Sequence, residues 1–240
     1  MKNKKNISDF YDAYSEQQQK MWHNERHYFL IEQLKKLGLK KNSMVLEIGC
    51  GIGTVSNLIA PLIPKGKLYA TDISPKSIEI AKEHNKKYSN ALFFAADSTE
   101  NQIPDHNYDF IVLFDVLEHI EQNDRMQFLE NISKLMNEKT LLLINVPAPN
   151  AHIHAIETTP ELMQIIEVPV LIEDVVPILK KCQLEIRSFF TYDMWQKDEY
   201  QFYLIEKYKK YVFQKTQPDN KHNPQSIKNR IKKKINNITS

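Results

Sequence analysis

The residues with the clearest chemical potential form a glycine-rich turn, Glu47-Ile48-Gly49-Cys50-Gly51-Ile52-Gly53. The chain has five glycines, and three of them fall in this turn, which indicates that the backbone needs unusual freedom or a ligand approaches it closely. An apolar strand is predicted before the turn and a helix after it. The unpaired N–H groups at the start of such a helix predict a ligand near residues 47 to 54.

The spacing of the turn limits which ligand it can hold. A nicotinamide-binding turn reads G-x-G-x-x-G/A, whereas here Gly53 comes two residues after Gly51 and the sixth position is Thr54. The Gly-Lys-Ser/Thr end of a P-loop is absent. Glu47, directly before the first glycine, would repel a pyrophosphate. It would favour a cationic ligand, such as one with an ammonium and a sulfonium group.

Four motifs, each at the end of a predicted strand, resemble those of class I S-adenosylmethionine-dependent methyltransferases. They are VLEIGCGIG from Val45, ATDIS around Asp72, ADS around Asp97, and FDVLEHI from Phe114. The resemblance covers residues 44 to 146 and implies S-adenosylmethionine as cofactor, with Asp72 on the ribose hydroxyls and Asp97 near the adenine amino group. The cofactor-binding residues that it implies are Glu47, Gly49, Cys50, Gly51, Gly53, Asp72, Ile73, Ser74, Asp97, Ser98, Phe114, Asp115 and Val116.

The elements that must position these residues alternate between strand and helix, which predicts parallel βαβ units. The resemblance implies a doubly wound, Rossmann-like α/β fold whose seven-stranded, mostly parallel sheet has the order 3-2-1-4-5-7-6, with the last strand antiparallel. Residues 7–37 are predicted to be helical. The predicted strands are 44–48, 67–73, 92–96, 108–114, 140–146, 184–191 and 200–206, and the other predicted helices are 54–62, 75–88, 123–136 and 173–181.

These elements predict three parts of the chain: a helical cap over 1–40, a cofactor-binding domain over 41–206 and a basic tail over 207–240. Within the domain, residues 147–173 carry four prolines and no clear single element. This insertion is rich in apolar residues. It either forms a lid over a partly apolar acceptor or packs against the N-terminal helix.

A hydroxyl acceptor would need a general base, and histidine is the side chain best suited to that role near neutral pH. His119 follows a strand at the ligand edge, so it is a candidate base, although a histidine there could also pack on the cofactor. His27 and His152 are the other catalytic candidates, from the N-terminal helix and the insertion. His23 and His154 are further candidates, and Arg26 is a candidate partner for the cofactor carboxylate.

The acceptor class is narrowed by what the chain lacks. An Asn-Pro-Pro-Tyr motif, used by many amino methyltransferases of nucleic acids and proteins, is absent after Phe114, and the net charge is only +2. No metal-ligand cluster is evident, and no metal is expected. We therefore expect an enzyme that methylates a small molecule, as an O-methyltransferase of a sugar or biosynthetic intermediate. The alternatives are a lipid or quinone precursor at a membrane surface and, third, a protein or nucleic acid.

The tail has a composition of its own. From Lys207 to Ser240 there are ten Lys and Arg residues against one Asp, and Ile227, Ile231, Ile235 and Ile238 recur at helical spacing. This pattern suits either a basic amphipathic helix on an anionic membrane, over residues 227–238, or a solvated tail. The two cysteines offer no disulfide framework, and no secretory signal is evident. We expect a cytoplasmic protein with at most weak contact to the inner membrane face.

Overall fold

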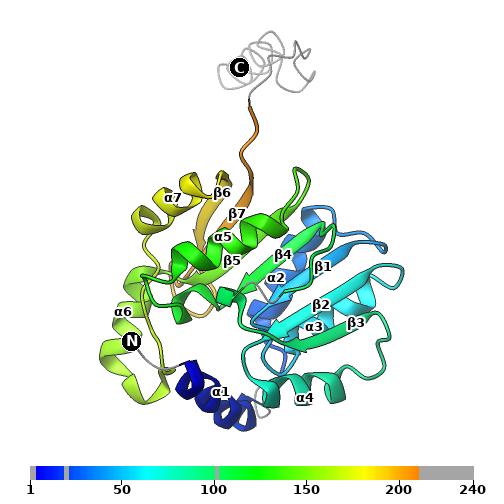
Figure 1. The fold of residues 1–240 in the computed structure, drawn as a ribbon. Coiled ribbons are helices and arrows are strands. Elements are labelled where there is room, and N and C mark those ends of the chain that lie inside the picture. The colour runs from blue at the N-terminus through cyan, green and yellow to red at the C-terminus, as the bar shows by residue number, and fades with distance from the viewer. Residues whose placement is uncertain (1–3, 19–21, 101–102, 211–240) are drawn as a thin grey trace, which may run out of the picture. The chain divides into compact units, whose positions relative to one another are not determined.

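A seven-stranded sheet dominates the computed structural model, which describes residues 4–18, 22–100 and 103–210 (Figure 1). Its strand order is β3-β2-β1-β4-β5-β7-β6. The first five strands pair in parallel, and the last strand in the chain runs antiparallel to both of its neighbours. The predicted fold class and strand order are therefore confirmed. The strands are β1 Met44–Ile48, β2 Lys67–Asp72, β3 Ala91–Ala95, β4 Phe110–Phe114, β5 Leu141–Pro147, β6 Leu184–Tyr192 and β7 Tyr200–Lys207.

Helices cover both faces of this sheet. Figure 1 shows α5 and α7 in front of it and α2 and α3 behind it. Because both faces are covered, every residue of β4 is buried, as its unbroken apolar run FIVLF predicts. The helices that flank the sheet are α2 Glu25–Lys36, α3 Thr54–Ile59, α4 Pro75–His84, α5 Arg125–Leu135 and α7 Ile172–Lys181.

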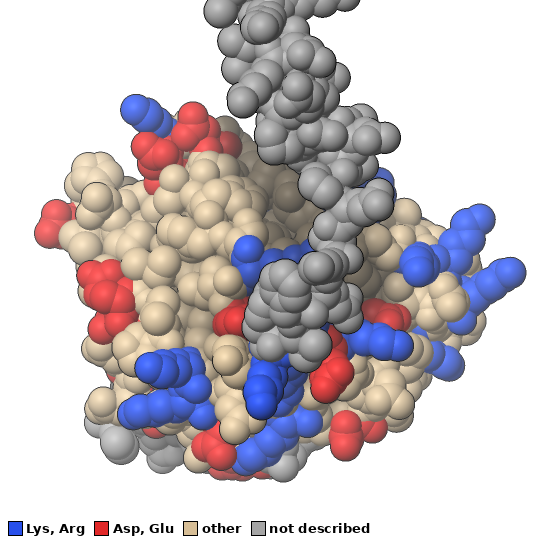
Figure 2. Space-filling view, turned by 90° about the horizontal axis from the view of Figure 1, so that it is seen from above, with Lys and Arg blue, Asp and Glu red and all other residues tan. Residues whose placement is uncertain are grey.

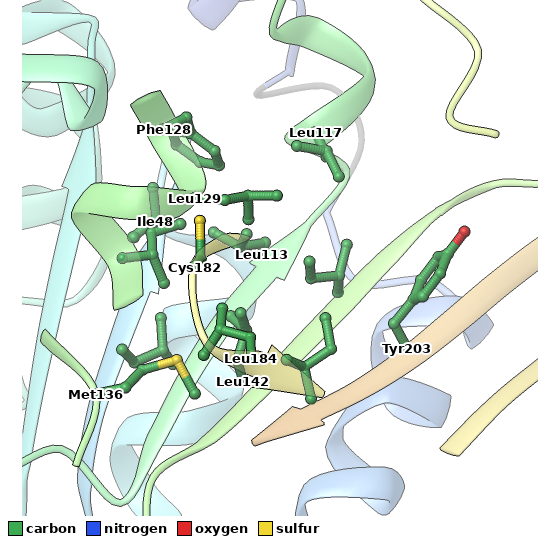
Figure 3. Close-up of a cluster of buried hydrophobic side chains, with 14 of the residues drawn as sticks. Ile48, Leu113, Leu117, Phe128, Leu129, Met136, Leu142, Cys182, Leu184 and Tyr203 are labelled. Carbon is green, nitrogen blue, oxygen red and sulfur yellow. The ribbon is translucent and has the colours of Figure 1, made fainter. Parts of the chain in front are cut away.

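Two apolar clusters fix the sheet between these helices. On one face, Ile48 and Leu113 of adjacent strands pack with Phe128 and Leu129 of α5 (Figure 3). On the other face, the strands pack against α2, whose Leu30 is fully buried. Burial of a large apolar side chain contributes about 1.5–3 kcal/mol, so the two clusters hold the carboxyl ends of β1 and β4 in fixed positions.

The N-terminal cap consists of two helices, α1 Lys4–Gln18 and α2, so the prediction of one helix over 7–37 was wrong. Asn24 explains the interruption. Its backbone is extended, with φ −131°, and its side chain accepts a hydrogen bond from the N–H of His27, while the Asn24 N–H donates to His27 Nδ1. This reciprocal capping box begins a new helix at Glu25, and it outweighs the continuous helical pattern of the sequence.

The insertion is more regular than its prolines predict. Helix α6, Pro149–Thr158, follows β5 directly, and a short 3-10 helix, η4 Pro160–Leu162, comes after it. Pro149 occupies the first turn of α6, where a missing N–H costs nothing. The chain then runs to α7 without regular structure, and Gln201 Nε2 of β7 donates to the Val170 carbonyl at 2.6 Å. Pro149 and Pro160 therefore mark the starts of elements, not their absence.

The chain divides into two units, one ending at Tyr208 and one from Lys209 to Ser240. The predicted amphipathic segment 227–238 lies outside the described residues, so its membrane role stays a prediction. Among the described helices, none is long and apolar enough to cross a membrane. On the visible part of the face in Figure 2, residues of both charge signs are interspersed.

Candidate active site

A cavity of about 550 Å³ lies at the carboxyl ends of β1, β2 and β4, where ligands bind in open parallel sheets. Helix α1 and the residues between η4 and α7 complete its wall. Of the thirteen residues implied for cofactor binding, the cavity brings eleven together, all except Gly53 and Ser74. Those that line it are Glu47, Gly49, Cys50, Gly51, Asp72, Ile73, Asp97, Ser98, Phe114, Asp115 and Val116.

The glycine turn bends sharply under the cavity. Gly49 has φ +74°, and a Cβ atom added there would lie 2.4 Å from Val116 Cγ2, so only glycine fits. The N–H groups of Gly49 and Cys50 both donate to the Thr71 carbonyl, at 2.7 and 2.9 Å. These bonds tie the turn to the end of β2. Gly53 is the N-cap residue of α3 and its carbonyl accepts a hydrogen bond from Asn85 Nδ2 at 3.1 Å, so its role is structural.

Glu47 lies at the floor of the cavity and is almost fully buried. Burial raises its pKa to about 8, although the hydrogen bond that Ser56 Oγ donates to it at 2.5 Å acts in the opposite direction. The carboxyl group is therefore mainly protonated at neutral pH in the ligand-free protein. Its expected attraction for a cation requires that it first lose this proton.

Replacing Glu47 by Gln should change how stability depends on pH. The pKa of Glu47 is raised in the folded state, so its contribution to the free energy of unfolding is complete below about pH 4.5 and is lost as the pH rises toward about 8. Between these pH values the free energy of unfolding of the wild type should fall by up to about 1.4 kcal/mol per pH unit because of this group. Urea unfolding at pH 5 to 8 should show a shallower decline for Glu47→Gln. The exposed control Glu138→Gln should keep the wild-type slope, and equal slopes in all three proteins would contradict the assignment.

Asp72 ends β2 and directs both carboxylate oxygens toward backbone N–H groups. Gly51 N donates to Oδ2 at 2.8 Å and Ser74 N donates to Oδ1 at 2.9 Å. Burial nevertheless raises the pKa of Asp72, with these hydrogen bonds opposing the shift. Each oxygen can accept more than one hydrogen bond, so the carboxylate can serve the turn and a ligand together.

Asp97 and Ser98 line another part of the cavity wall, at the short helix η2 Ser98–Glu100. The N–H and hydroxyl of Thr99 both donate to Asp97 Oδ1, at 2.8 and 2.6 Å. Asn131 of α5 donates to the carbonyls of Ser98 and Thr99, at 3.2 and 2.9 Å. Helix α5 thus fixes the position of this wall, through contacts that the local sequence around Asp97 does not reveal.

Asp115 follows β4 in the left-handed region, with φ 58°. Its Oδ2 pairs with Arg26 of α2, and Asn145 Nδ2 donates to its Oδ1 at 3.3 Å. Burial would lower the pKa of Arg26, but Asp115 outweighs burial and raises it, so the guanidinium stays charged. The Arg26 carbon Cζ also lies 4.9 Å from the centre of the Tyr200 ring. The structure thus places Arg26 at the cavity, as the sequence suggested, but already paired.

Helix α1, within the predicted helical cap, brings to the cavity two tyrosines that were not among the predicted site residues. Tyr11 and Tyr14 line the cavity, and the Tyr11 hydroxyl is buried with no hydrogen-bond partner among the described residues. Asp12 fastens the helix, because its Oδ1 accepts from Ser74 Oγ at 2.5 Å and from the Lys76 N–H at 3.1 Å. The two tyrosines lie three positions apart on a polar helix, so they share one face. This spacing is the sequence signal from which their place at the cavity could have been predicted.

His119 lines the cavity at the end of η3, Leu117–His119. Its Nδ1 lies 2.8 Å from the Ile166 carbonyl oxygen, which can only accept, so Nδ1 carries the proton. No hydrogen bond from the described residues engages Nε2. Burial lowers the pKa of His119, while Glu167 and the Ile166 carbonyl oppose that shift. The ring is therefore neutral at pH 7 with its basic nitrogen available.

The other candidate histidines are placed differently. His27 lines the cavity, but its Nδ1 accepts the Asn24 N–H, and burial lowers its pKa to about 4, which suits a helix cap better than a base. His152 is buried outside the lining, with Nε2 2.6 Å from Glu167 Oε2. His23 Nε2 bonds the Thr54 carbonyl at 3.1 Å. His154 is exposed on α6.

Residues 46–142 match the family model described as "Methyltransferase domain". A malonyl-[acyl-carrier protein] O-methyltransferase of Ilyobacter polytropus is 34% identical over 100 residues, 42% of this chain and 36% of that protein. A tRNA N(3)-methylcytidine methyltransferase of Schizosaccharomyces pombe is 28% identical over 145 residues, 56% of this chain and 57% of that protein. The chain thus spans between about a third and three fifths of the length of these curated relatives.

Solved structures resemble this chain in fold over most of its length, although their sequence identity to it is low. Magnesium protoporphyrin IX methyltransferase from Synechocystis, with bound SAH, superposes with a TM-score of 0.67 at 16% identity, over 85% of this chain and 99% of that one. The strand order, the cavity at the strand ends and the matched domain all point to a methyltransferase fold. Residues 46–142 therefore match a methyltransferase domain, and the chain shares its fold with a solved methyltransferase.

Proposed function

We propose that this protein transfers a methyl group from S-adenosylmethionine to a hydroxyl oxygen of a small molecule, with His119 as the general base. The observation that carries this proposal is the state of His119: neutral, with Nδ1 fixed on the Ile166 carbonyl and Nε2 left for an acceptor proton. Because the pKa of His119 is lowered from its usual value, the imidazole is in the unprotonated form that a base needs at neutral pH.

The cavity residues fit the cofactor. Asp72 has lone pairs left for two ribose hydroxyls, and Arg26 and Asp115 at the cavity suit an amino-acid carboxylate and ammonium. Glu47 can ionise beside a cation. Bound S-adenosylmethionine supplies the methyl group on a positively charged sulfur. The protein's own contribution is to orient the acceptor and take its proton.

The charge of the cavity favours a neutral or cationic acceptor. Six acidic residues line it, whereas Arg26 is the only Lys or Arg among the described residues that do so, and Asp115 already pairs with it. Since Arg26 would also serve the cofactor carboxylate, no further Lys or Arg of the described lining is left to receive a carboxylate acceptor. The acidic lining residues are Glu47, Asp72, Asp97, Asp115, Glu121 and Asp124.

The aromatic and apolar part of the lining indicates the shape of the acceptor. Tyr11, Tyr14 and Ile166 supply this surface. This lining favours a ring-bearing intermediate, such as a quinone precursor, as a second candidate beside a sugar. The membrane association considered for such a substrate depends on residues 227–238 and stays a prediction.

The test is a transfer assay with labelled S-adenosylmethionine and acceptors that differ in charge. Catechol and methyl glucoside offer hydroxyls, while benzoate and bulk tRNA represent a carboxylate and a nucleic acid. We expect label in one of the hydroxyl acceptors and none in benzoate. Transfer to benzoate or to tRNA, with neither hydroxyl compound labelled, would reject the proposed acceptor class.

A further inference from the structure

Three ionisable side chains from separate parts of the chain meet beside the cavity. His119 comes from η3, His152 from α6, and Glu167 from the stretch between η4 and α7. Glu167 Oε2 lies 2.6 Å from His152 Nε2, and Glu167 Oε1 lies 3.8 Å from His119 Nδ1. The carboxyl group thus bridges two imidazoles, of which only His119 lines the cavity.

Glu167 is held rigidly in this position. The Gln164 N–H donates to its Oε1 at 2.8 Å, and the His152 ring donates to its Oε2. Burial alone would raise the pKa of Glu167, but the hydrogen bond from His152, the electrostatic interaction with His119 and the hydrogen bond from the Gln164 N–H outweigh it and leave the pKa below its usual value. The group is therefore a carboxylate at neutral pH.

The backbone around Glu167 is fastened to the elements that carry His119. Arg125, buried at the start of α5, donates to the carbonyls of Val168 and Ile120, at 2.7 and 3.2 Å. The Val168 N–H donates to the Glu118 carbonyl at 2.9 Å, next to His119. One short stretch therefore supplies both the carbonyl that fixes the His119 tautomer and the carboxylate beside it.

We propose that Glu167 is a positioning residue for the base: its carboxylate, held by His152, keeps the proton on His119 Nδ1 and stabilises the imidazolium that forms when Nε2 takes a proton. This inference rests on the proposed function of His119. A fixed negative charge beside the far nitrogen makes the exposed nitrogen more basic, as in other carboxylate–histidine pairs. Glu167 itself does not line the cavity, so it acts through His119.

Other titratable groups near His119 and Glu167 also affect the pKa of His119. Asp115 also raises the pKa of His119, and His152 lowers it. Tyr11 faces the ring with its centroid 6.4 Å away. The titratable groups that face His119 or Glu167 from neighbouring elements are Tyr11 and Tyr14 of α1, Asp115 and Glu118 after β4, and His152 of α6.

The test is an NMR titration of the histidine ring protons in the full-length protein, with the His119 signal identified by its loss in His119→Asn. In Glu167→Gln, the pKa of His119 should fall by about one unit or more, as expected for loss of an opposite charge within about 4–6 Å. The exposed control Glu161→Gln should leave it unchanged. An unchanged His119 pKa in Glu167→Gln would overturn the proposal, whether or not the protein transfers methyl groups.

Two further variants separate charge from structure. His152→Gln keeps a donor for the carboxylate and removes a group that lowers the pKa of His119, so this pKa should not fall below the wild-type value. Where Glu167→Gln does not fold, Glu167→Asp serves, because the shorter side chain withdraws the charge from Nδ1 and should lower the His119 pKa by a smaller amount. A His119 pKa that is equal in Glu167→Asp and wild type would reject the role of Glu167.

Discussion

Asp72→Ala should weaken S-adenosylmethionine binding by about 100-fold or more while the protein still folds. Hydrogen bonds to a charged group contribute about 1.5 kcal/mol or more each, and losing two of them corresponds to about two powers of ten in affinity. The substitution also removes the acceptor of the Gly51 and Ser74 N–H groups, so the turn itself loses support.

Calorimetric titration with the cofactor is the direct measurement. Circular dichroism establishes that Asp72→Ala is folded, and Asp105→Ala, at an exposed position, is the control that should bind as the wild type does. Asp72→Asn keeps one acceptor oxygen and should lie between the two. Equal affinity of Asp72→Ala and wild type would exclude the cofactor assignment of this carboxylate.

His119→Asn should lower kcat by about 100- to 10,000-fold, the range that a general base contributes, and leave cofactor affinity nearly unchanged. The asparagine amide can still donate to the Ile166 carbonyl, so the variant removes the base and keeps the hydrogen bond of Nδ1. Burial lowers the pKa of His119 below the usual 6.5, and the base is active above that pKa. The wild-type rate should therefore fall only in acid below pH 6.5, and the variant should lack this acidic limb.

A pH–rate profile with the acceptor found in the transfer assay tests both parts of this expectation. His154→Asn, exposed on α6, is the matched control and should keep the full rate and the same profile. If His119→Asn retained the wild-type kcat, His119 would be a packing residue, which is the alternative that the sequence left open.

The parts of the site that the sequence predicted are those encoded locally. Glu47 and Asp72 lie near the carboxyl ends of β1 and β2, and Asp97 follows β3, and parallel strands bring their carboxyl ends to one edge of the sheet. The strand order followed from the resemblance of four short motifs. Because each motif combines a strand end with a turn, its position depends little on distant residues.

The parts that the sequence did not predict depend on contacts between distant segments. Tyr11 reaches the cavity because Asp12 binds the start of α4, more than sixty residues away. Glu167 meets His119 because Arg125 fixes the backbone between them. The break before α2 could have been predicted from the sequence. Asn24 is a favourable N-cap residue, and the His27 side chain, three positions later, can accept the Asn24 N–H, so the two form a capping signal.

The hydrogen bonds of Asp12 at the start of α4 also bear on how long a ligand stays in the cavity. Helix α1 is part of the cavity wall, and one carboxylate oxygen receives both the Ser74 hydroxyl and the Lys76 N–H. Ser74 lies two residues from Asp72, so the same short stretch supports the cofactor site and the helix that covers it. We therefore expect that a weaker contact between Asp12 and the start of α4 would shorten the residence time of a ligand in the cavity.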